Sequence, residues 1–335
     1  MTQDRELDDL DQRLLHAVQL RPRAPWSAVA PIVGADAVTL ARRWERLSAE
    51  GVVYTTGIVA TPRTTAFIEV TCAPQDSLTI AGELARDAHA VTIDLTAGGR
   101  DLVVTVAARD LAGLAAWALE RFRGMPSVRA VRTHIASEII SDARHWNLRS
   151  LSSREIRAVE RAVPHSRVPM PRLSPDELGL LLDELAADGR VPATVLADRT
   201  GIPVRRARDA LAAMQANGSL VIRVDIARAF TPWPVYTWYF LRVPAAQAGD
   251  IGSRLARLEE VRMVASAVGD YNILMAAWLR GLGDVGRMEA AIEAKLPGAV
   301  IADRSVVLRT VKHAGHLLDP QGNATAADQV APGKL

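Results

Sequence analysis

The sequence contains one cysteine, Cys72, in 335 residues. A lone cysteine excludes an intrachain disulfide and a cysteine-based zinc or iron–sulfur centre, and it fits the reducing environment of the cytoplasm. No uncharged apolar run approaches the roughly 18 residues that a transmembrane helix needs, so no membrane partner is expected. The first residues, MTQDRELDDLDQR, are acidic and polar and lack the pattern of a secretory signal. These absences predict a cytoplasmic location.

Lysine is nearly absent, because Lys295, Lys312 and Lys334 are its only occurrences and arginine supplies the remaining positive charge. The formal net charge is only +2, so the chain as a whole is not a polycation. Any affinity for nucleic acid must therefore come from local patches of arginine.

Catalytic and metal-binding motifs are also missing. The sequence has no glycine-rich phosphate loop, no paired-carboxylate motif and no Ser/His/Asp signature. His134, His145, His313 and His316 do not have the spacing of metal ligands with carboxylates nearby. His313 and His316, three residues apart, could chelate weakly, but we interpret their spacing as a surface coincidence. We therefore predict no catalytic residue, no metal site and no cofactor.

The most informative stretch runs from Gly34 to Gly51, GADAVTLARRWERLSAEG. At about 3.6 residues per turn it places apolar side chains on one helix face and arginines on the other. Asp36 is the expected N-cap, and Gly51 is placed to end the helix. An amphipathic segment at 25–33 stops just before Gly34. Two short helices joined by such a turn fit either an αα-hairpin with a solvated arginine face or a helix-turn-helix, whose second helix enters the DNA major groove.

The first half continues with further helices and strands. Residues 7–20 predict a helix before this pair, and residues 52–60 predict a strand or wing after it. A β-α-β-β-α-β order, the ferredoxin-like arrangement, is predicted from segments 66–72, 77–89, 91–97, 101–108, 111–122 and 128–140. Such a sheet has helices on one face only, so its other face needs a partner.

Residues 141–172 are rich in arginine and contain three prolines, at 164, 169 and 171. Residues 152–163 predict a short helix with Ser152 and Glu155 as a capping box. We interpret the segment as a basic linker. It is either a solvated tether or a contact to the DNA backbone.

The pattern then repeats, with Arg23 falling on Arg190 and Gly34 on Gly201, a shift of 167 residues. Three helices are expected within 173–218, a wing strand at 219–227 and a second β-α-β-β-α-β order within 235–311. The shift grows to 171 at Gly98 and Gly269. Five aromatic residues at the start of this second sheet predict core packing, with a ligand pocket as the alternative: Trp233, Tyr236, Trp238, Tyr239 and Phe240.

This pattern, present twice, resembles the Lrp/AsnC family of bacterial and archaeal transcription regulators. The first copy carries Leu7-Asp8…Asp11…Leu14-Leu15, RRWERLSAEGVV at 42–53 and the turn from Gly98 to Asp101. The second copy carries DELAADGR at 183–190, DALAAMQANGSLV at 209–221 and GDYN at 269–272. The resemblance covers nearly all of residues 5–312. It implies an α+β fold with two winged helix-turn-helix heads and two ferredoxin-like (RAM) domains, whose sheets pair as an intrachain pseudo-dimer.

The domains expected from this resemblance follow the repeat. They are a first head at 5–61, a first RAM-like domain at 62–140, the basic linker at 141–172, a second head at 173–231, a second RAM-like domain at 232–312 and a flexible tail at 313–335.

In that family the heads bind double-stranded DNA. The resemblance places the DNA-binding residues on the third helix of each head: Val38, Thr39, Arg42, Arg43 and Arg46 in the first, and Arg205, Arg206 and Arg208 in the second. At the 167-residue shift Arg42 becomes Asp209 and Arg46 becomes Ala213, so the heads are not equivalent. Either they read different half-sites, which we favour, or the second head is structural.

In that family the RAM domains pair and sense small molecules, often amino acids. The resemblance places the effector site at the turn between the second and third strands of each domain: Gly98, Gly99, Arg100 and Asp101, and Gly269, Asp270, Tyr271 and Asn272. An aspartate would hold an α-amino group, and Arg100 a carboxylate. The alternative is a plain hairpin turn. Further assembly into homo-oligomers is also expected.

Two rival functions stay open. Siroheme decarboxylases resemble the same architecture and carry histidine and tyrosine clusters in the second unit, whereas residues 235–300 here contain no histidine. The other rival is an effector-binding co-regulator with degenerate heads. The sequence predicts a DNA-binding regulator that responds to an amino acid or related metabolite, and not an enzyme.

Overall fold

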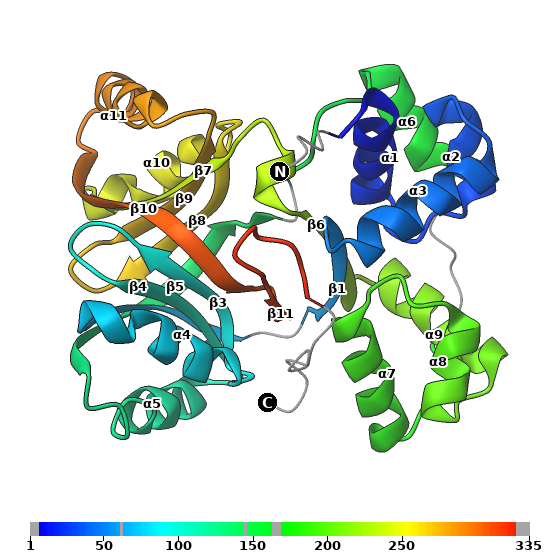
Figure 1. The fold of residues 1–335 in the computed structure, drawn as a ribbon, viewed down its shortest axis with the longest axis horizontal. Coiled ribbons are helices and arrows are strands. Elements are labelled where there is room, and N and C mark those ends of the chain that lie inside the picture. The colour runs from blue at the N-terminus through cyan, green and yellow to red at the C-terminus, as the bar shows by residue number, and fades with distance from the viewer. Residues whose placement is uncertain (1–6, 61–62, 144–145, 163–168, 326–335) are drawn as a thin grey trace. The chain divides into compact units, whose positions relative to one another are not determined.

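A computed structural model describes residues 7–60, 63–143, 146–162 and 169–325. The chain forms two compact units (Figure 1). The first takes its described residues from Met1–Thr61, Asn147–Phe230 and Asn323–Lys334, and the second from Pro62–Trp146 and Thr231–Gly322. Each unit therefore draws on both halves of the sequence. Within the described ranges, no helix has the length and apolar character needed to span a membrane.

The described part of the first unit contains two sets of three helices, each set followed by a strand, and one further helix between the sets. Its elements are α1 (Asp9–Leu20), α2 (Trp26–Val33), α3 (Ala37–Ala49), β1 (Val53–Val59), α6 (Ser153–Ala162), α7 (Pro175–Ala187), α8 (Ala193–Thr200), α9 (Val204–Ala216) and β6 (Leu220–Ile226). The predicted cap is confirmed, because the Asp36 carboxylate accepts from the backbone N–H groups of Val38 and Thr39. The turn between α2 and α3 needs glycine, because Gly34 has a φ of 87°.

The two wing strands pair with each other. Strands β1 and β6 form an antiparallel two-stranded sheet in which Val53 lies opposite Ile226 and Val59 opposite Leu220. Each strand supplies hydrogen-bond partners to the backbone groups along one edge of the other. These backbone hydrogen bonds join the two sets of helices into one unit.

Two arginines at repeat-related positions reinforce this pairing. Arg23 donates to the backbone carbonyls of Gly189 and Val191 at 2.7 and 2.8 Å. Arg190 donates to a backbone carbonyl next to Arg23, and its guanidinium lies 4.2 Å from the ring centroid of Trp26. Burial, together with the charge of Arg23, lowers the pKa of Arg190 to about 10. Arg190 therefore stays charged at neutral pH, and both guanidiniums bridge the two heads.

The segment before the second head packs against the first. Its buried apolar side chains are Leu148, Leu151 and Val159. The Leu151 N–H donates to His16 Nδ1 at 2.9 Å, and the predicted capping box of Ser152 and Glu155 is confirmed by their mutual hydrogen bonds. Residues 147–162 therefore differ from the solvated tether expected for the linker, because burial of apolar side chains ties them to α1 and α2. The predicted helix end at Val163 and Pro164 lie outside the described residues.

The second unit contains the two ferredoxin-like element orders. Its elements are β2 (Thr64–Cys72), α4 (Ser77–Ala85), β3 (Ala90–Thr96), β4 (Leu102–Ala108), α5 (Leu111–Glu120), β5 (Val128–Ser141), β7 (Val235–Arg242), α10 (Ala248–Leu255), β8 (Val261–Val268), β9 (Ile273–Leu279), α11 (Gly283–Lys295), β10 (Val300–His313) and β11 (His316–Leu317). Its described strands form one sheet in the order β11-β10-β3-β4-β2-β5-β8-β9-β7, and β7 also pairs with β10. The sheet therefore closes on itself, and strands from the two halves meet at β5–β8 and β10–β3.

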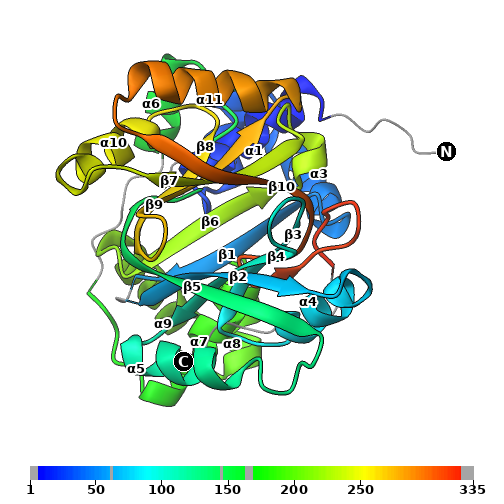
Figure 2. The ribbon, with the colours of Figure 1, turned by 90° about the vertical axis from the view of Figure 1, so that its left-hand side faces the viewer.

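The helices of the second unit cover this sheet from outside. Helices α4 and α5 lie on one side of the strands, and α10 and α11 lie on the other (Figures 1 and 2). Alternation along each strand sends one set of side chains to the helices and the other to the interior. In β2, Ile68 packs under the helices, whereas Phe67 meets Trp238 of β7 at a centroid distance of 5.6 Å. All five aromatic residues at 233–240 are buried, as core packing predicts.

Gly57 offers a test of the contact between β1 and α7. A Cβ at this position would lie 2.8 Å from the carbonyl oxygen of Leu185. We expect Gly57→Ala to lower the free energy of unfolding by about 1–3 kcal/mol in urea titrations, because backbone must move to make room. The control is Gly82→Ala in α4, where the new methyl meets nothing within 4 Å. It should leave stability unchanged or raise it by about 0.5–1 kcal/mol. Equal stability of the Gly57 variant and wild type would contradict this packing.

His16 predicts a loss of stability in acid. Burial lowers its pKa from 6.5 to about 4. Between these values the unfolded chain binds a proton that the folded chain excludes, so stability falls as pH drops from 6.5 towards 4, by up to about 1.4 kcal/mol per pH unit. His16→Gln keeps an acceptor for Leu151 but does not titrate. Urea unfolding between pH 7 and 4.5 should therefore be steeper in pH for wild type than for this variant, and parallel curves would exclude the effect.

Candidate DNA-binding and effector sites

Helix α3 presents an exposed outer face at its N-terminal half. Val38 is 69% exposed, and Arg42 is exposed without an ion pair to any described residue. The Thr39 hydroxyl lies 2.6 Å from the Asp36 carboxylate that caps the helix. Of the predicted DNA-binding residues in this head, Arg42 is therefore the cation that stands unpaired in the described structure.

The other two arginines of α3 are bound to α1. Arg43 contacts Asp8 and Asp11 at 2.5 and 2.8 Å, and Arg46 contacts Asp11 at 2.8 Å. Hydrogen bonds to these carboxylates raise the pKa of Arg43. Burial alone would raise the pKa of Asp8, but the hydrogen bond from Arg43 and the surrounding charge hold it below its usual value. Arg43 and Arg46 thus brace α3 against α1 and fix the direction of its outer face.

Helix α9 carries its cations differently. The Arg205 side chain is 93% exposed and lies 3.9 Å from Asp209, one helical turn away. Arg206 contacts Glu177 of α7 at 3.0 Å, so it is partly engaged within the head. Arg208 is exposed and forms no ion pair within the described residues. The second head therefore offers Arg205 and Arg208 to solvent, with the negative charge of Asp209 beside them.

The β3–β4 turn lies against β10 from the other half of the chain. Gly98 has a φ of 111°, and a Cβ there would lie 3.3 Å from Ser305 Oγ. A Cβ at Gly99 would lie 3.6 Å from an Asp303 oxygen. The glycines therefore let the turn approach this strand closely.

Arg100 points from this turn into a buried polar network. Its guanidinium donates to Glu69 at 2.8 Å, to Ser305 at 2.8 Å and to Asp303 at 2.5 Å. It also lies 3.8 Å from the ring centroid of Phe240. Every guanidinium nitrogen thus has a partner, and two of those partners belong to the second half of the chain.

His134 and Tyr271 continue the network toward the second turn. His134 Nε2 lies 2.7 Å from Glu69, and the His134 ring packs on Tyr271 at 5.4 Å. Burial would raise the pKa of Glu69, but the hydrogen bond from His134 and the charge of Arg100 lower it. A Cβ at Gly269 would overlap the His134 ring, so any other residue here would displace that side chain. Burial and the charge of Glu69 raise the pKa of Tyr271.

The remaining predicted turn residues have backbone partners or face solvent. The Asp101 carboxylate accepts from the Cys72 N–H at 2.8 Å, and the Asn272 side chain accepts from the Val243 N–H at 2.9 Å. These two residues therefore perform the same structural task in the two halves. Asp270 is exposed at the tip of the second turn.

Four residues of this network were missed by sequence reasoning: Glu69, His134, Asp303 and Ser305. Glu69 carries a readable signal, because it is the one charged residue in the strand AFIEVTC and sits on the face that needs a partner. His134 carries no comparable signal, because its spacing from the other histidines indicates no site. Among the described residues, no group of three or more histidine, cysteine, aspartate or glutamate side chains is placed to hold a metal ion.

The first half thus combines a helix-turn-helix head with a ferredoxin-like domain. Residues 7–48 match the AsnC-type helix-turn-helix domain, and residues 65–146 match the Lrp/AsnC ligand-binding domain. The first half of the chain therefore contains both domains of an Lrp/AsnC-type regulator. The match favours the helix-turn-helix over the plain αα-hairpin for the helices around Gly34.

Relatives of known sequence agree with this class. The chain is 24% identical over 139 residues to uncharacterized HTH-type transcriptional regulators of Pyrococcus abyssi (strain GE5 / Orsay) and Pyrococcus horikoshii. The similarity covers 40% of this chain and 88% of each regulator.

A solved structure is similar along nearly the whole chain. The siroheme decarboxylase NirDL matches with a TM-score of 0.57 and 15% identity, covering 91% of this chain and 93% of NirDL. Its co-complex with an iron-uroporphyrin III analogue matches equally well. At this level of identity the likeness shows a shared fold.

The ion pair between Arg100 and Glu69 predicts that substitutions at these two positions have strongly coupled effects on the free energy of unfolding. Arg100→Met leaves the Glu69 carboxylate buried without its cation, so we expect the free energy of unfolding to fall by about 3 kcal/mol. The double variant Arg100→Met/Glu69→Gln should recover at least about 1 kcal/mol of that loss in urea titrations. Strictly additive effects of the two single substitutions would show that the pair is not coupled.

Proposed function

We propose that the protein is a sequence-specific DNA-binding transcriptional regulator of Lrp/AsnC type that acts in the cytoplasm and responds to a small molecule. The observation that carries this proposal is the outer face of α3. There Arg42, exposed and without an ion pair to any residue that the structure describes, follows a capped N-terminus within the matched helix-turn-helix domain. Recognition helices contact bases with their N-terminal residues. The surrounding ion pairs of Arg43 and Arg46 support this reading, because they hold the helix in one orientation.

We further propose that the chain is two copies of the head-plus-RAM pattern acting as an intrachain pseudo-dimer. Support comes from the β1–β6 pairing and from the two joints between halves in the large sheet. The two heads would then read unlike half-sites, since Arg42 corresponds to Asp209. Assembly of such chains into homo-oligomers is part of this proposal.

The proposed effector carries a carboxylate and binds at the β3–β4 turn. The Asp303 side chain is partly exposed, and it is the outermost carboxylate on Arg100. An effector carboxylate would replace it on the guanidinium, as charge-assisted bidentate pairing favours. Because Asp303 belongs to β10 and Arg100 to the first half, this exchange would loosen one joint between the halves. An amino acid or related metabolite meets this requirement.

Arg42→Ala tests the first head. We expect operator affinity to fall about five- to hundredfold, or about 1–3 kcal/mol, for loss of one bidentate base contact. Mobility shifts on DNA upstream of the protein's own gene, at two salt concentrations, measure it. The control is Arg109→Ala, which removes the same charge from an exposed site in the second unit.

The outcomes separate the two heads. If Arg42→Ala binds as tightly as Arg109→Ala, α3 is not the recognition helix. The double variant Arg205→Ala/Arg208→Ala should also weaken binding if α9 reads a half-site. Unchanged affinity in that variant would assign the second head a structural role.

A tetrapyrrole decarboxylase is the second candidate, favoured by the fold shared with NirDL over 91% of this chain. Against it, residues 235–300 lack histidine, and His134 is already hydrogen-bonded to Glu69. Titration with iron-uroporphyrin III, followed by absorption, discriminates the two. Tight saturable binding with turnover of siroheme would favour the enzyme over the regulator.

A further inference from the structure

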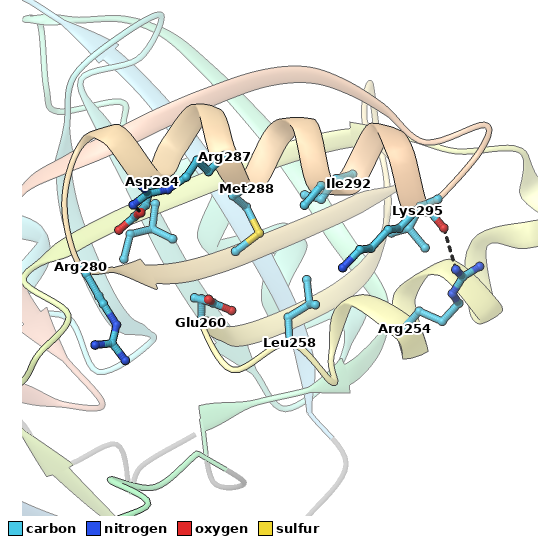
Figure 3. A pocket seen from close by; sticks show the side chains of 12 residues that line it. Arg254, Leu258, Glu260, Arg280, Asp284, Arg287, Met288, Ile292 and Lys295 are labelled. Atoms are coloured by element: carbon cyan, nitrogen blue, oxygen red, sulfur yellow. Dashed lines mark hydrogen bonds and ion pairs between the residues drawn. The ribbon is translucent and has the colours of Figure 1, made fainter.

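A pocket lies in the second half of the chain, away from both turns in sequence. It has a volume of about 480 Å³, is open to solvent, and lies between α11, the end of α10 and the loop before β8 (Figure 3). Its wall is apolar at Leu258, Leu279, Met288 and Ile292. A volume of roughly 300–1,000 Å³ with a mainly apolar lining is typical of small-molecule sites.

Two cations stand at one end of this pocket. Lys295, the last residue of α11, extends beneath the helix toward Leu258 (Figure 3). Its ammonium has no hydrogen bond or ion pair within the described residues, and the neighbouring Arg254 donates to the Lys295 carbonyl at 2.6 Å. Both side chains border the cavity. An anionic group that entered here would meet positive charge and an apolar wall together.

In the first half of the chain, side chains fill the position that corresponds to this pocket. At the 171-residue shift, Met288 corresponds to Trp117 and Leu258 to Asp87. The Trp117 indole is buried, donates to Asp87 at 2.7 Å and packs edge-to-face on Phe122 at 5.7 Å. The second half has a shorter side chain in place of the indole and no carboxylate to receive its N–H. The cavity is therefore a local difference between two otherwise matching frameworks.

We infer that this pocket binds an apolar monocarboxylate with an aryl or alkyl body about the size of an indole. The carboxylate pairs with Lys295 beside Arg254, and the apolar body occupies the space that Trp117 fills in the first half. Glu260 faces Met288 across the cavity (Figure 3). A negative charge on the body of the ligand would meet this carboxylate, so the part of the ligand beside Met288 is uncharged.

The test uses the full chain and indole-3-propionate as probe, measured by isothermal titration calorimetry without DNA. We expect one equivalent to bind, and the neutral amide of the same probe to bind at least tenfold more weakly. Lys295→Met should weaken binding of the acid three- to tenfold and leave the amide unchanged. The titration is independent of the heads, so its outcome and that of the mobility shifts are separable.

Met288→Trp should fill the pocket as Trp117 does and abolish binding, whereas Met288→Leu should retain it. Thermal unfolding of each variant checks that it is folded. Ala291→Phe is a second way of filling the cavity, at a partly buried residue of its lining, if the tryptophan is not tolerated. The proposal fails if wild type shows no saturable binding, if the amide binds as well as the acid, or if the filled variants bind like wild type.

Discussion

Strand pairing between the two halves is the constraint on which the rest of this structure depends. A four-stranded ferredoxin-like sheet has two open edges and one bare face, and each would leave backbone groups or apolar side chains in water. Here the joints β5–β8 and β10–β3 satisfy the edges, and Phe67 and Trp238 cover the bare faces from both sides. The same solution recurs in the first unit at β1–β6. Once these edges are joined, polar groups such as Arg100 are trapped between strands and must find partners there.

The two halves differ at places where both partners of a contact are different residues. In the first head, Arg43 and Arg46 neutralise the buried Asp11, whereas the second head has Ala210, Ala213 and Leu178 at the corresponding positions. An ion-paired brace is thus replaced by apolar packing, as expected when a buried charge cluster is lost as a set. The pocket around Met288 is a difference of the same kind, since the indole and its carboxylate acceptor are both absent there. The order of helices and strands is the same in the two halves, whereas small groups of side chains that contact one another differ.

Local signals in the sequence predicted the secondary structure well, because they act within a few residues. The caps at Asp36 and Ser152, the turn at Gly34 and the strand at 66–72 all belong to this class. The location of the turns was also readable. Their partners were not, because Arg100 and Asp303 lie on different halves and meet only through strand register. The folding of residues 147–162 onto the first head was missed for a related reason: arginine content concealed the three apolar side chains that direct the packing.

The covalent link between β1 and β6 has a consequence for concentration. Two separate chains that pair through such strands dissociate on dilution, because their association is bimolecular and costs translational and rotational entropy. Within one chain the same pairing is unimolecular, and its effective concentration is set by the intervening segment. The two heads therefore stay joined however few copies a cell contains. Occupancy of a target that needs both heads would then rise in proportion to protein concentration. A dimer that dissociates would instead have to reach the concentration at which it assembles before it could bind such a target.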